Sequence, residues 1–306
     1  MLPAQPLPAW LERMLPFRRY RVRVRDWAMH LMEDGPHDGR PVLLLHGNPT
    51  WGFLWRRVAQ EIPRIDPTCR LRLIMPDLIG LGLSDHPADM RVHTLDFHAR
   101  QMGALVDELK LEDFIFVGQD WGGPIGGCVC ADRPARVAGA VILNTALGPP
   151  HAGFRPTEFH RFSHFPVVSD LVFRLGLFPA RGMALVQGDR HSVSGAVGRA
   201  YRWPLRDRLT NVAPLALARM VPNTLTHPSV DRLKLCEAWA RGFTKPAELV
   251  WGAKDPILGR VLKRTKAMLP HARVTETQAG HFLQEEVPRE IAEAIVRVAR
   301  AVEAKA

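Results

Sequence analysis

Apolar and polar residues along the first half of the chain follow the pattern of strands separated by a helix. The stretch at 19–27 (RYRVRVRDW) alternates apolar with basic residues, and a turn at Asp34-Gly35-Pro36 ends the strand-like stretch that follows it. A helix with apolar residues at helical spacing is predicted to begin near Thr94. Three continuous apolar runs are typical of buried strands in a parallel sheet: residues 42–47, 71–77 and 114–120. The alternation of strands and helices predicts an α/β fold with a mostly parallel sheet.

The pattern changes in the second half of the chain. A strand-like run at 137–145 is followed by residues 147–222, which are rich in Pro, Gly, Phe, His and Arg and contain no strand-like run. Alternation resumes with the apolar run at 247–252. We therefore expect one core, formed by residues 1–146 and 223–306, with a sheet of about eight strands, and a helical cap at 147–222 inserted over the edge of that sheet.

Composition supports a single large core. The chain has 306 residues, of which 46% are hydrophobic. No apolar stretch reaches the roughly 18–20 residues that span a bilayer, and the first residues lack the apolar region of a secretory signal, so we expect a soluble, cytoplasmic protein. The four cysteines form no CxxC pair and no Cys/His cluster with zinc-site spacing. We therefore expect free thiols, and neither a metal nor an organic cofactor.

The formal net charge of +10 raises the question of an acidic partner. The basic residues are dispersed along the chain and no nucleic-acid-binding motif accompanies them, so nucleic acid is not an expected partner. Peripheral membrane contact stays open for the N-terminal segment, in which apolar residues are interleaved with arginines. These apolar residues are Trp10, Leu11, Met14, Leu15 and Phe17.

A sharp turn between a strand and a helix is predicted at residues 118–122 (GQDWG). Small residues two positions before and two after Asp120 are needed there, because larger side chains would collide with the neighbouring backbone. Such a turn is typical of the nucleophile in the α/β-hydrolase fold, where the central residue is commonly a serine. A carboxylate at this place can displace a leaving group at saturated carbon, giving an ester that water then cleaves. Asp120 is therefore the candidate nucleophile.

His281 and Asp255 complete the order nucleophile, acid, histidine along the chain. His281 follows Gly280 directly after the last predicted strand, at 273–278, where this fold has its general base. Asp255 follows the preceding strand, and with Pro256 it would by itself be an ordinary turn former. In this order, the acid accepts the Nδ1–H of the histidine, so that Nε2 can take a proton from water.

The loop at 45–51 (LHGNPTW) supplies a third feature at a strand end. A loop that contains glycine can direct backbone N–H groups at developing negative charge, together with the N–H of Trp121. We therefore expect a hole for an oxyanion, which suits the cleavage of an ester.

Three stretches together resemble the haloalkane dehalogenase family, in the order that the family has them. They are residues 46–51 (HGNPTW), 76–85 (PDLIGLGLSD) and 118–123 (GQDWGG). The resemblance covers essentially the whole chain outside the predicted cap. It implies a hydrolytic dehalogenase that forms an aspartyl alkyl ester and releases alcohol and halide, with Asp120 as nucleophile, His281 as base and Asp255 as acid. It also implies that Trp121 and Asn48 hold the departing halide.

Two features vary within that family. Some members have the acid after the strand that ends near residue 145, but this chain has Leu143-Asn144-Thr145 there, so the acid is expected to be Asp255. The second halide ligand is either a tryptophan of the cap or the asparagine of the His-Gly-Asn motif. Asn48 is the favoured candidate, and Trp203, the only tryptophan in the predicted cap, is the other.

Other functions stay open at this point. The same pattern, with its Leu-Pro-x-Trp-Leu start, also resembles the β-lactone decarboxylases of bacterial long-chain olefin synthesis, which use an equivalent aspartate. An epoxide hydrolase normally has two cap tyrosines, whereas this chain has only Tyr20 and Tyr201. A non-catalytic binding protein of the α/β-hydrolase fold commonly lacks one triad member, and all three are present.

The expected partners are a small hydrophobic substrate, water and a halide ion, and the pattern does not indicate an oligomeric state.

Overall fold

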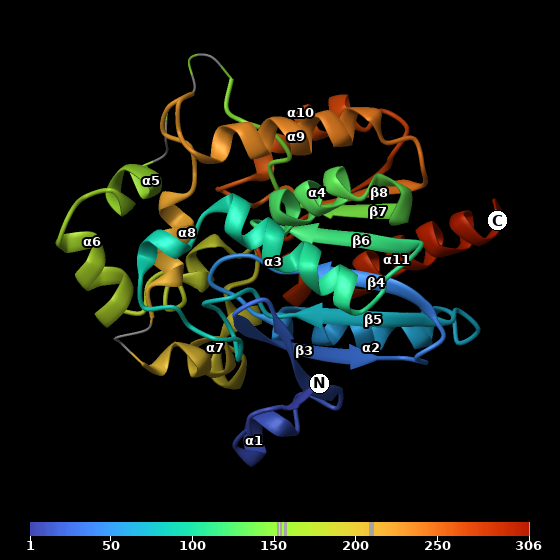
Figure 1. Cartoon of the computed structure of the whole chain (residues 1–306), viewed down its shortest axis with the longest axis horizontal. Coiled ribbons are helices and arrows are strands. Elements are labelled where there is room, and N and C mark those ends of the chain that lie inside the picture. Colours follow the sequence, from blue (N-terminus) through green and yellow to red (C-terminus); the bar gives the residue numbers. More distant parts are fainter. Residues whose placement is uncertain (152, 154, 156–157, 208–210, 306) are drawn as a thin grey trace.

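The computed structural model describes residues 1–151, 153, 155, 158–207 and 211–305. Its centre is one sheet, drawn across the middle of Figure 1. The strands are β1 (Leu2–Pro3), β2 (Arg18–Val24), β3 (Trp27–Asp34), β4 (Arg40–Leu45), β5 (Leu71–Pro76), β6 (Phe114–Gln119), β7 (Val137–Leu143), β8 (Ala247–Gly252) and β9 (Arg273–Thr277).

The sheet has nine strands among the described residues, in the order β1-β2-β3-β5-β4-β6-β7-β8-β9. The first three strands and the pairing of β3 with β5 are antiparallel, whereas β5, β4 and β6 to β9 are parallel to one another. The predicted mostly parallel sheet is thus confirmed. The prediction of about eight strands missed β1, because two residues are too few to show a period of two.

Helices flank the sheet on both faces. The α-helices are α1 (Ala9–Glu12), α2 (Arg56–Ile65), α3 (Leu95–Glu108), α4 (Gly122–Asp132), α5 (Glu158–Ser163), α6 (Val168–Asp170), α7 (Gly195–Arg202), α8 (Ala213–Arg219), α9 (Ser229–Gly242), α10 (Leu262–Met268) and α11 (Pro288–Glu303). The short helical turns are η1 (Gly52–Trp55), η2 (Met90–Val92), η3 (Pro134–Arg136), η4 (Leu171–Leu175, a π-helical turn), η5 (Met183–Val186), η6 (Arg190–Val193), η7 (Trp203–Arg206), η8 (Gly259–Val261) and η9 (Leu283–Glu285).

Two hydrophobic clusters lie on opposite faces of the sheet. Successive side chains of a strand point to opposite faces, and in β4 Leu43 and Leu45 enter one cluster while Val42 and Leu44 enter the other. The first cluster contains residues of α3, α4 and α9, and the second contains residues of α2 and α11. Continuous apolar runs are therefore required, because both faces of these strands are buried.

The residues between β7 and α9 add helices but, among those that the structure describes, no strand. Helices α5 to α8 gather at the end of the sheet toward which β6 points, on the left of Figure 1. They are joined to the core by specific contacts. The indole Nε1 of Trp51 donates to the carbonyl of Ala200 over 3.2 Å, and the rings of Phe53 and Tyr201 pack edge to face.

The N-terminal segment packs into the protein. Leu11 and Leu15 are buried in the second cluster, and the Trp10 ring meets the Trp203 ring edge to face, with the Arg199 guanidinium over its plane. The apolar residues considered for membrane contact are therefore mostly engaged with the core. No helix in the described part of the chain is both long and apolar enough to cross a membrane.

Candidate active site

Asp120 lies at the sharp turn between β6 and α4, as the Gly-x-Asp-x-Gly pattern predicts. Its φ of 49° falls in the left-handed region, which is unfavourable for residues other than glycine and is common at strained functional positions. The turn brings the start of α4 against β4, since a Cβ at Gly122 would lie 2.1 Å from the Leu45 carbonyl oxygen. Only glycine fits there, so the sequence requirement is steric.

The loop after β4 contacts the Asp120 carboxylate through a backbone N–H group. The backbone N–H of Asn48 donates to Asp120 Oδ1 over 2.7 Å. A Cβ at Gly47 would lie 2.1 Å from the same oxygen, so a side chain at that position would displace the carboxylate. The loop therefore holds one carboxylate oxygen with a backbone donor and leaves Oδ2 for other contacts.

His281 lies between two carboxylates. Its Nδ1 is 2.9 Å from Asp255 Oδ2, within hydrogen-bond distance, and its Nε2 is 3.6 Å from Asp120 Oδ2, which is longer than a hydrogen bond. The ring is 2% exposed. Backbone contacts fix its position, because its N–H donates to the Val186 carbonyl and its carbonyl accepts from the Gln119 amide.

The two carboxylates change the ionisation of the histidine. Burial alone would lower the pKa of His281, but the charge and hydrogen bond of Asp255, together with the nearby Asp120 carboxylate, raise this pKa to about 10. Burial would likewise raise the pKa of Asp255, yet the charge and hydrogen bond of His281 lower it. The raised pKa favours the protonated form of His281 near neutral pH in the free site.

Asn144 is a site residue that the sequence analysis noted only for lacking a carboxylate. It follows β7, and its Nδ2 donates to Asp255 Oδ2 over 2.8 Å while its Oδ1 accepts from the N–H of Gly252 over 2.8 Å. Its carbonyl accepts from the N–H of Asp120 over 3.2 Å. Asn144 thus contacts both the turn of the nucleophile and the acid. Its place at the end of a buried parallel strand was the available signal.

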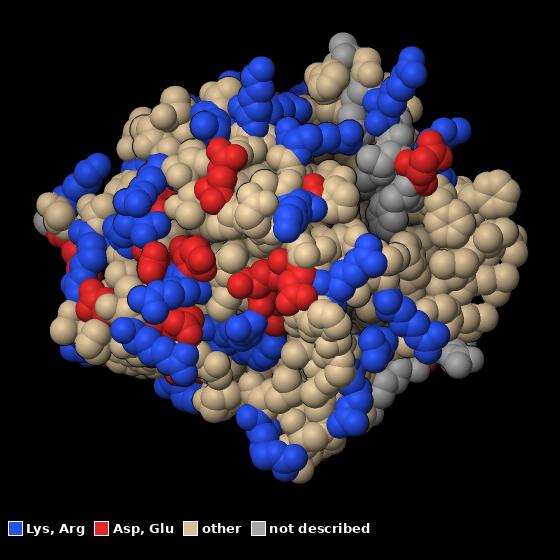
Figure 2. Space-filling view, turned by 180° about the vertical axis from the view of Figure 1, so that it is seen from behind, with Lys and Arg blue, Asp and Glu red and all other residues tan. Residues whose placement is uncertain are grey.

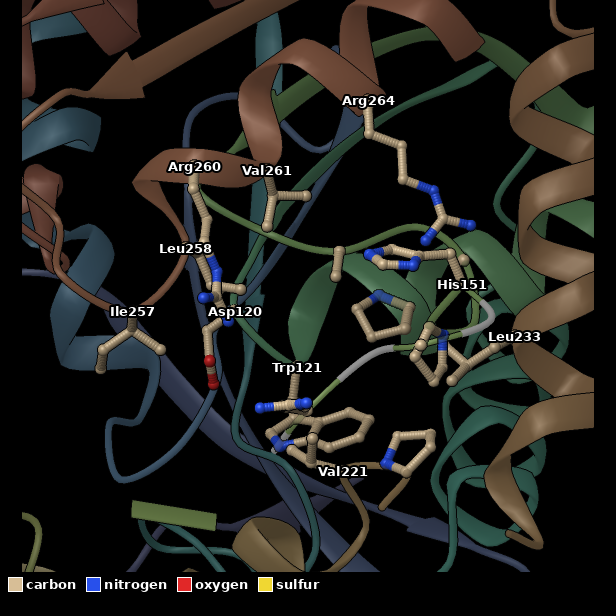
Figure 3. Close-up of a pocket in the computed structure, with 17 residues that line it drawn as sticks. Asp120, Trp121, His151, Val221, Leu233, Ile257, Leu258, Arg260, Val261 and Arg264 are labelled. Carbon is tan, nitrogen blue, oxygen red and sulfur yellow. The ribbon is translucent and has the colours of Figure 1, made fainter. Parts of the chain in front are cut away.

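A cleft of about 590 Å³ opens next to Asp120 and Trp121. Figure 3 shows these two residues near its centre, with Ile257, Leu258 and Val261 on one side and Leu233 of α9 on the other. The lining is mainly apolar, which suits a hydrophobic substrate. It also contains three arginines that the sequence analysis did not foresee: Arg155, Arg260 and Arg264.

The two candidates for the second halide ligand, Asn48 and Trp203, lie in different places in the structure. Asn48 is at the site, but its Nδ2 donates to the Pro214 carbonyl of α8 over 2.8 Å, so one of its two amide hydrogens is already engaged. Trp203 is not among the residues that line the cleft at Asp120, and its ring packs against Trp10. Among the described contacts, the Trp203 indole meets the N-terminal segment and not Asp120, so Trp203 stays the less favoured of the two candidates.

Comparisons with known proteins agree with this architecture. The family model described as alpha/beta hydrolase fold matches residues 40–288. Haloalkane dehalogenase 2 of Mycobacterium tuberculosis is 35% identical over 277 residues, which cover 88% of this chain and 90% of that protein. The haloalkane dehalogenase of Mycobacterium marinum is 33% identical over 274 residues, with 88% and 87% covered.

Solved structures give the same result. The crystal structure of haloalkane dehalogenase DbeA from Bradyrhizobium elkani USDA94 superposes with a TM-score of 0.83 at 26% identity, over 95% of this chain and all of that one (100%). The crystal structure of a mutant of haloalkane dehalogenase DatA from Agrobacterium tumefaciens C58 has a TM-score of 0.81 at 25% identity, with 92% and 96% covered. The chain therefore belongs to the haloalkane dehalogenase family of the α/β hydrolases.

Proposed function

We propose that the protein cleaves carbon–halogen bonds of haloalkanes by hydrolysis, in two steps. In the first, Oδ2 of Asp120 attacks the carbon that carries the halogen, a C–O bond forms, and the halide leaves with the electron pair of the C–X bond. The product of this step is an aspartyl alkyl ester. This step needs no proton transfer, because a carboxylate oxygen attacks without losing a proton.

In the second step, water cleaves the ester. Once Asp120 is a neutral ester, His281 gives up its Nε2 proton to solvent. The neutral Nε2 then takes a proton from the water, whose oxygen attacks the carbonyl carbon of the Asp120 ester. The alcohol then leaves with the proton held by His281, and the remaining proton of the new Asp120 carboxyl group passes to His281, so that the site returns to a carboxylate beside a protonated histidine. Asp255 holds the ring through Nδ1 and stabilises the histidinium that forms.

The observation that carries this proposal is the position of His281, within 2.9 Å of Asp255 and 3.6 Å of Asp120. The family membership and the mainly apolar cleft support the same substrate class. We assign the halide to Trp121 and Asn48, since Trp121 lines the cleft beside Asp120 and Asn48 reaches the Asp120 carboxylate. We also propose that residues 147–222 act as the cap over this cleft, because residues 148, 150, 151, 153, 155, 221 and 222 take part in its lining.

Two alternatives are less well supported. An epoxide hydrolase needs a tyrosine hydroxyl that can reach the epoxide oxygen, but the hydroxyl of Tyr201 is buried and donates to Glu285. A β-lactone decarboxylase would use the same Asp120, and the relatives described above are haloalkane dehalogenases by name. The two activities differ in product, because one releases halide and the other releases carbon dioxide.

A trapping experiment tests the two-step assignment. The variant His281→Ala keeps the nucleophile but lacks the base, so a reactive bromoalkane should alkylate it once and the ester should accumulate. Intact-mass spectrometry should then show one added alkyl group, mapped to the peptide that contains Asp120. Asp120→Asn should show neither adduct nor turnover with its fold intact, and His37→Ala, a change at an exposed histidine, should turn over like the wild type.

Two results would contradict the proposal. A His281→Ala protein that no bromoalkane alkylates, although the wild type consumes that substrate, would give histidine a role before or during the first step. Wild-type protein that releases carbon dioxide from a β-lactone and no halide from any haloalkane would replace the dehalogenase with the decarboxylase.

A further inference from the structure

Exposed apolar side chains gather in one short segment far along the chain from Asp120. Of the ten large hydrophobic residues that are exposed in the described part of the chain, five lie within residues 165–175. They are Phe165 (59% exposed), Val167 (69%), Val168 (42%), Leu171 (52%) and Leu175 (48%). We call these five residues the 165–175 patch. A contiguous exposed patch of this kind is typical of a site of protein or membrane contact.

Three residues of the patch, Val168, Leu171 and Leu175, lie on one face of a helical stretch whose other face is buried, and Phe165 and Val167 lie in the turn before it. Helix α6 continues directly into the π-helical turn η4. Ser169 and Phe173 face inward, and Phe173 packs with Leu215 and Ala218 of α8. The exposed positions Val168, Leu171 and Leu175 are apolar, so this stretch has apolar residues on its outward face as well as Phe173 on its inward face. Apolar side chains on an outward helix face are normally covered by a partner or lie in a membrane interface.

The turn that precedes α6 is also exposed, and its backbone is strained at Val167. Residues 164–168 are all exposed, and Val167 has a φ of 64°, a conformation that a β-branched residue adopts only at a cost in free energy. In Figure 2 the end of the molecule that carries α5 and α6 is a broad area with few charged side chains, and both basic and acidic side chains lie at its border. The patch therefore lies at one end of the molecule, where an extended surface can reach it.

The charges around the patch are mainly positive. Residues 155–181 contain four arginines, at 155, 161, 174 and 181, and two acidic residues. Glu158 pairs with Arg161 over 2.9 Å and Asp170 with Arg219 over 3.1 Å, so residues 155–181 carry an excess of two arginines over acidic residues. The whole chain carries a formal net charge of +10. Two copies that met through this patch would bring like charges together, whereas an anionic lipid surface would attract it.

We propose that the 165–175 patch is a membrane-docking surface that inserts its apolar side chains into the interface of a bilayer containing anionic lipids. The apolar residues enter between the headgroups, and the arginines around them face lipid phosphates. This surface differs from the N-terminal segment, whose Leu11 and Leu15 are buried in the core. It also holds whether or not the protein is a dehalogenase, because it rests on exposure and charge alone.

Vesicle binding tests the proposal on the full-length protein. Vesicles of phosphatidylcholine with phosphatidylglycerol should co-sediment the wild type, vesicles of phosphatidylcholine alone should bind it more weakly, and added salt should reduce binding to the anionic vesicles. Leu171→Glu and Phe165→Glu should each lower the partition coefficient at least about tenfold. Leu235→Glu is the matched control, since Leu235 of α9 is 47% exposed and lies outside the patch.

All three substitutions are at exposed positions, so circular dichroism should show the wild-type fold in each variant. If the wild-type protein does not bind anionic vesicles, the proposal is overturned. It is also overturned if the Leu171→Glu and Phe165→Glu proteins bind anionic vesicles as strongly as the wild type does. Equal binding to neutral and anionic vesicles would show that the arginines do not contribute, and would overturn the proposal of an anionic membrane. If the wild type self-associates and Leu171→Glu makes it monomeric without any vesicle binding, the patch contacts a second copy instead.

Discussion

At the scale of single residues, the charge of His281 depends on the state of Asp120. The raised pKa of about 10 comes from Asp255 and Asp120 together, after the opposing effect of burial. In the proposed mechanism the first step turns Asp120 into a neutral ester and removes one of these contributions. The pKa of His281 then falls, so alkylation itself favours the neutral imidazole that the second step needs.

A histidine titration followed by NMR tests this coupling. Asp120→Asn imitates the neutral ester, so we expect the pKa of His281 to be lower in this variant than in the wild type, by at least about one unit. The resonance is assigned as the one missing from His281→Gln. Equal pKa values in the two proteins would show that Asp120 does not influence the histidine.

The same pKa predicts how stability depends on pH. Because the folded-state pKa of His281 lies above the ordinary value of 6.5, its contribution to stability is complete below pH 6.5 and is lost as the pH rises through about 10. The free energy of unfolding should therefore fall over this alkaline range in the wild type, and fall less in His281→Gln. Urea denaturation at several pH values measures this free energy. If it depends on pH in the same way in the two proteins, the raised pKa of His281 is contradicted.

Asn144 is predicted to position the acid. Asn144→Ala removes the hydrogen bonds to Asp255 and Gly252, so the His281 ring loses part of its orientation. We expect ester hydrolysis to slow by about a hundredfold, with alkylation of Asp120 little changed, because the first step needs no histidine. Rapid-quench kinetics separate the two rates. An equal loss in both steps would indicate a general disturbance of the site instead.

At the scale of elements, the N-terminal segment acts as part of the core. Helix α1 is only four residues long and has no side-chain cap, so packing and not propensity holds it in place. Leu11 is fully buried in the cluster that α2 and α11 share, and Trp10 contacts Trp203 of η7. This segment therefore connects the sheet, the second cluster and the helices that follow β7.

Truncating Leu11 should measure that contribution. Leu11→Ala leaves a cavity in a closely packed cluster, and we expect it to lower the free energy of unfolding by about 2–5 kcal/mol. Leu2→Ala, at a 40% exposed position of β1, should change it by less than about 0.5 kcal/mol. Urea denaturation gives both values. Similar small effects would mean that the segment is detached in solution.

At the scale of the whole molecule, a buried ion pair of the core accepts a hydrogen bond from the helices between β7 and α9. Arg56 of α2 makes two hydrogen bonds with Glu285 of η9, at 2.6 and 2.9 Å, and both side chains are buried. Tyr201 of α7 donates to the same carboxylate, and burial is the main reason that its pKa is well above the ordinary value. A charge at this place is stable only while its partner is present.

The ion pair predicts a specific pattern of mutant stabilities. Glu285→Leu leaves the Arg56 charge buried without its partner, so we expect a loss of about 3–5 kcal/mol in the free energy of unfolding. Changing both residues, Arg56→Met with Glu285→Leu, should be less damaging than Glu285→Leu alone, because no unpaired charge remains. Chemical denaturation of the single and double variants measures this. A double variant that loses the sum of both single losses would show no coupling.

The fold class, the family and the order of the candidate triad could all be predicted from the amino-acid sequence. Buried parallel strands leave continuous apolar runs, and the steric demands of the turn at Asp120 leave glycines on both sides, so these features can be seen without a structure. The same holds for Asp255 and His281, which follow β8 and β9, two strands parallel to the one that ends at Asp120. The comparisons confirm the family and the fold.

Which distant side chains meet could be known only from the folded protein. Asn144 lies 111 positions from Asp255 in the sequence, and Trp203 lies far along the chain from the Trp10 ring that it contacts. Neither contact leaves a local period or motif, because each depends on how separate elements pack. The exposure of the 165–175 patch is of the same kind: its apolar residues resemble an ordinary buried helix until the fold shows which face α8 covers and which face has no neighbour in the described structure.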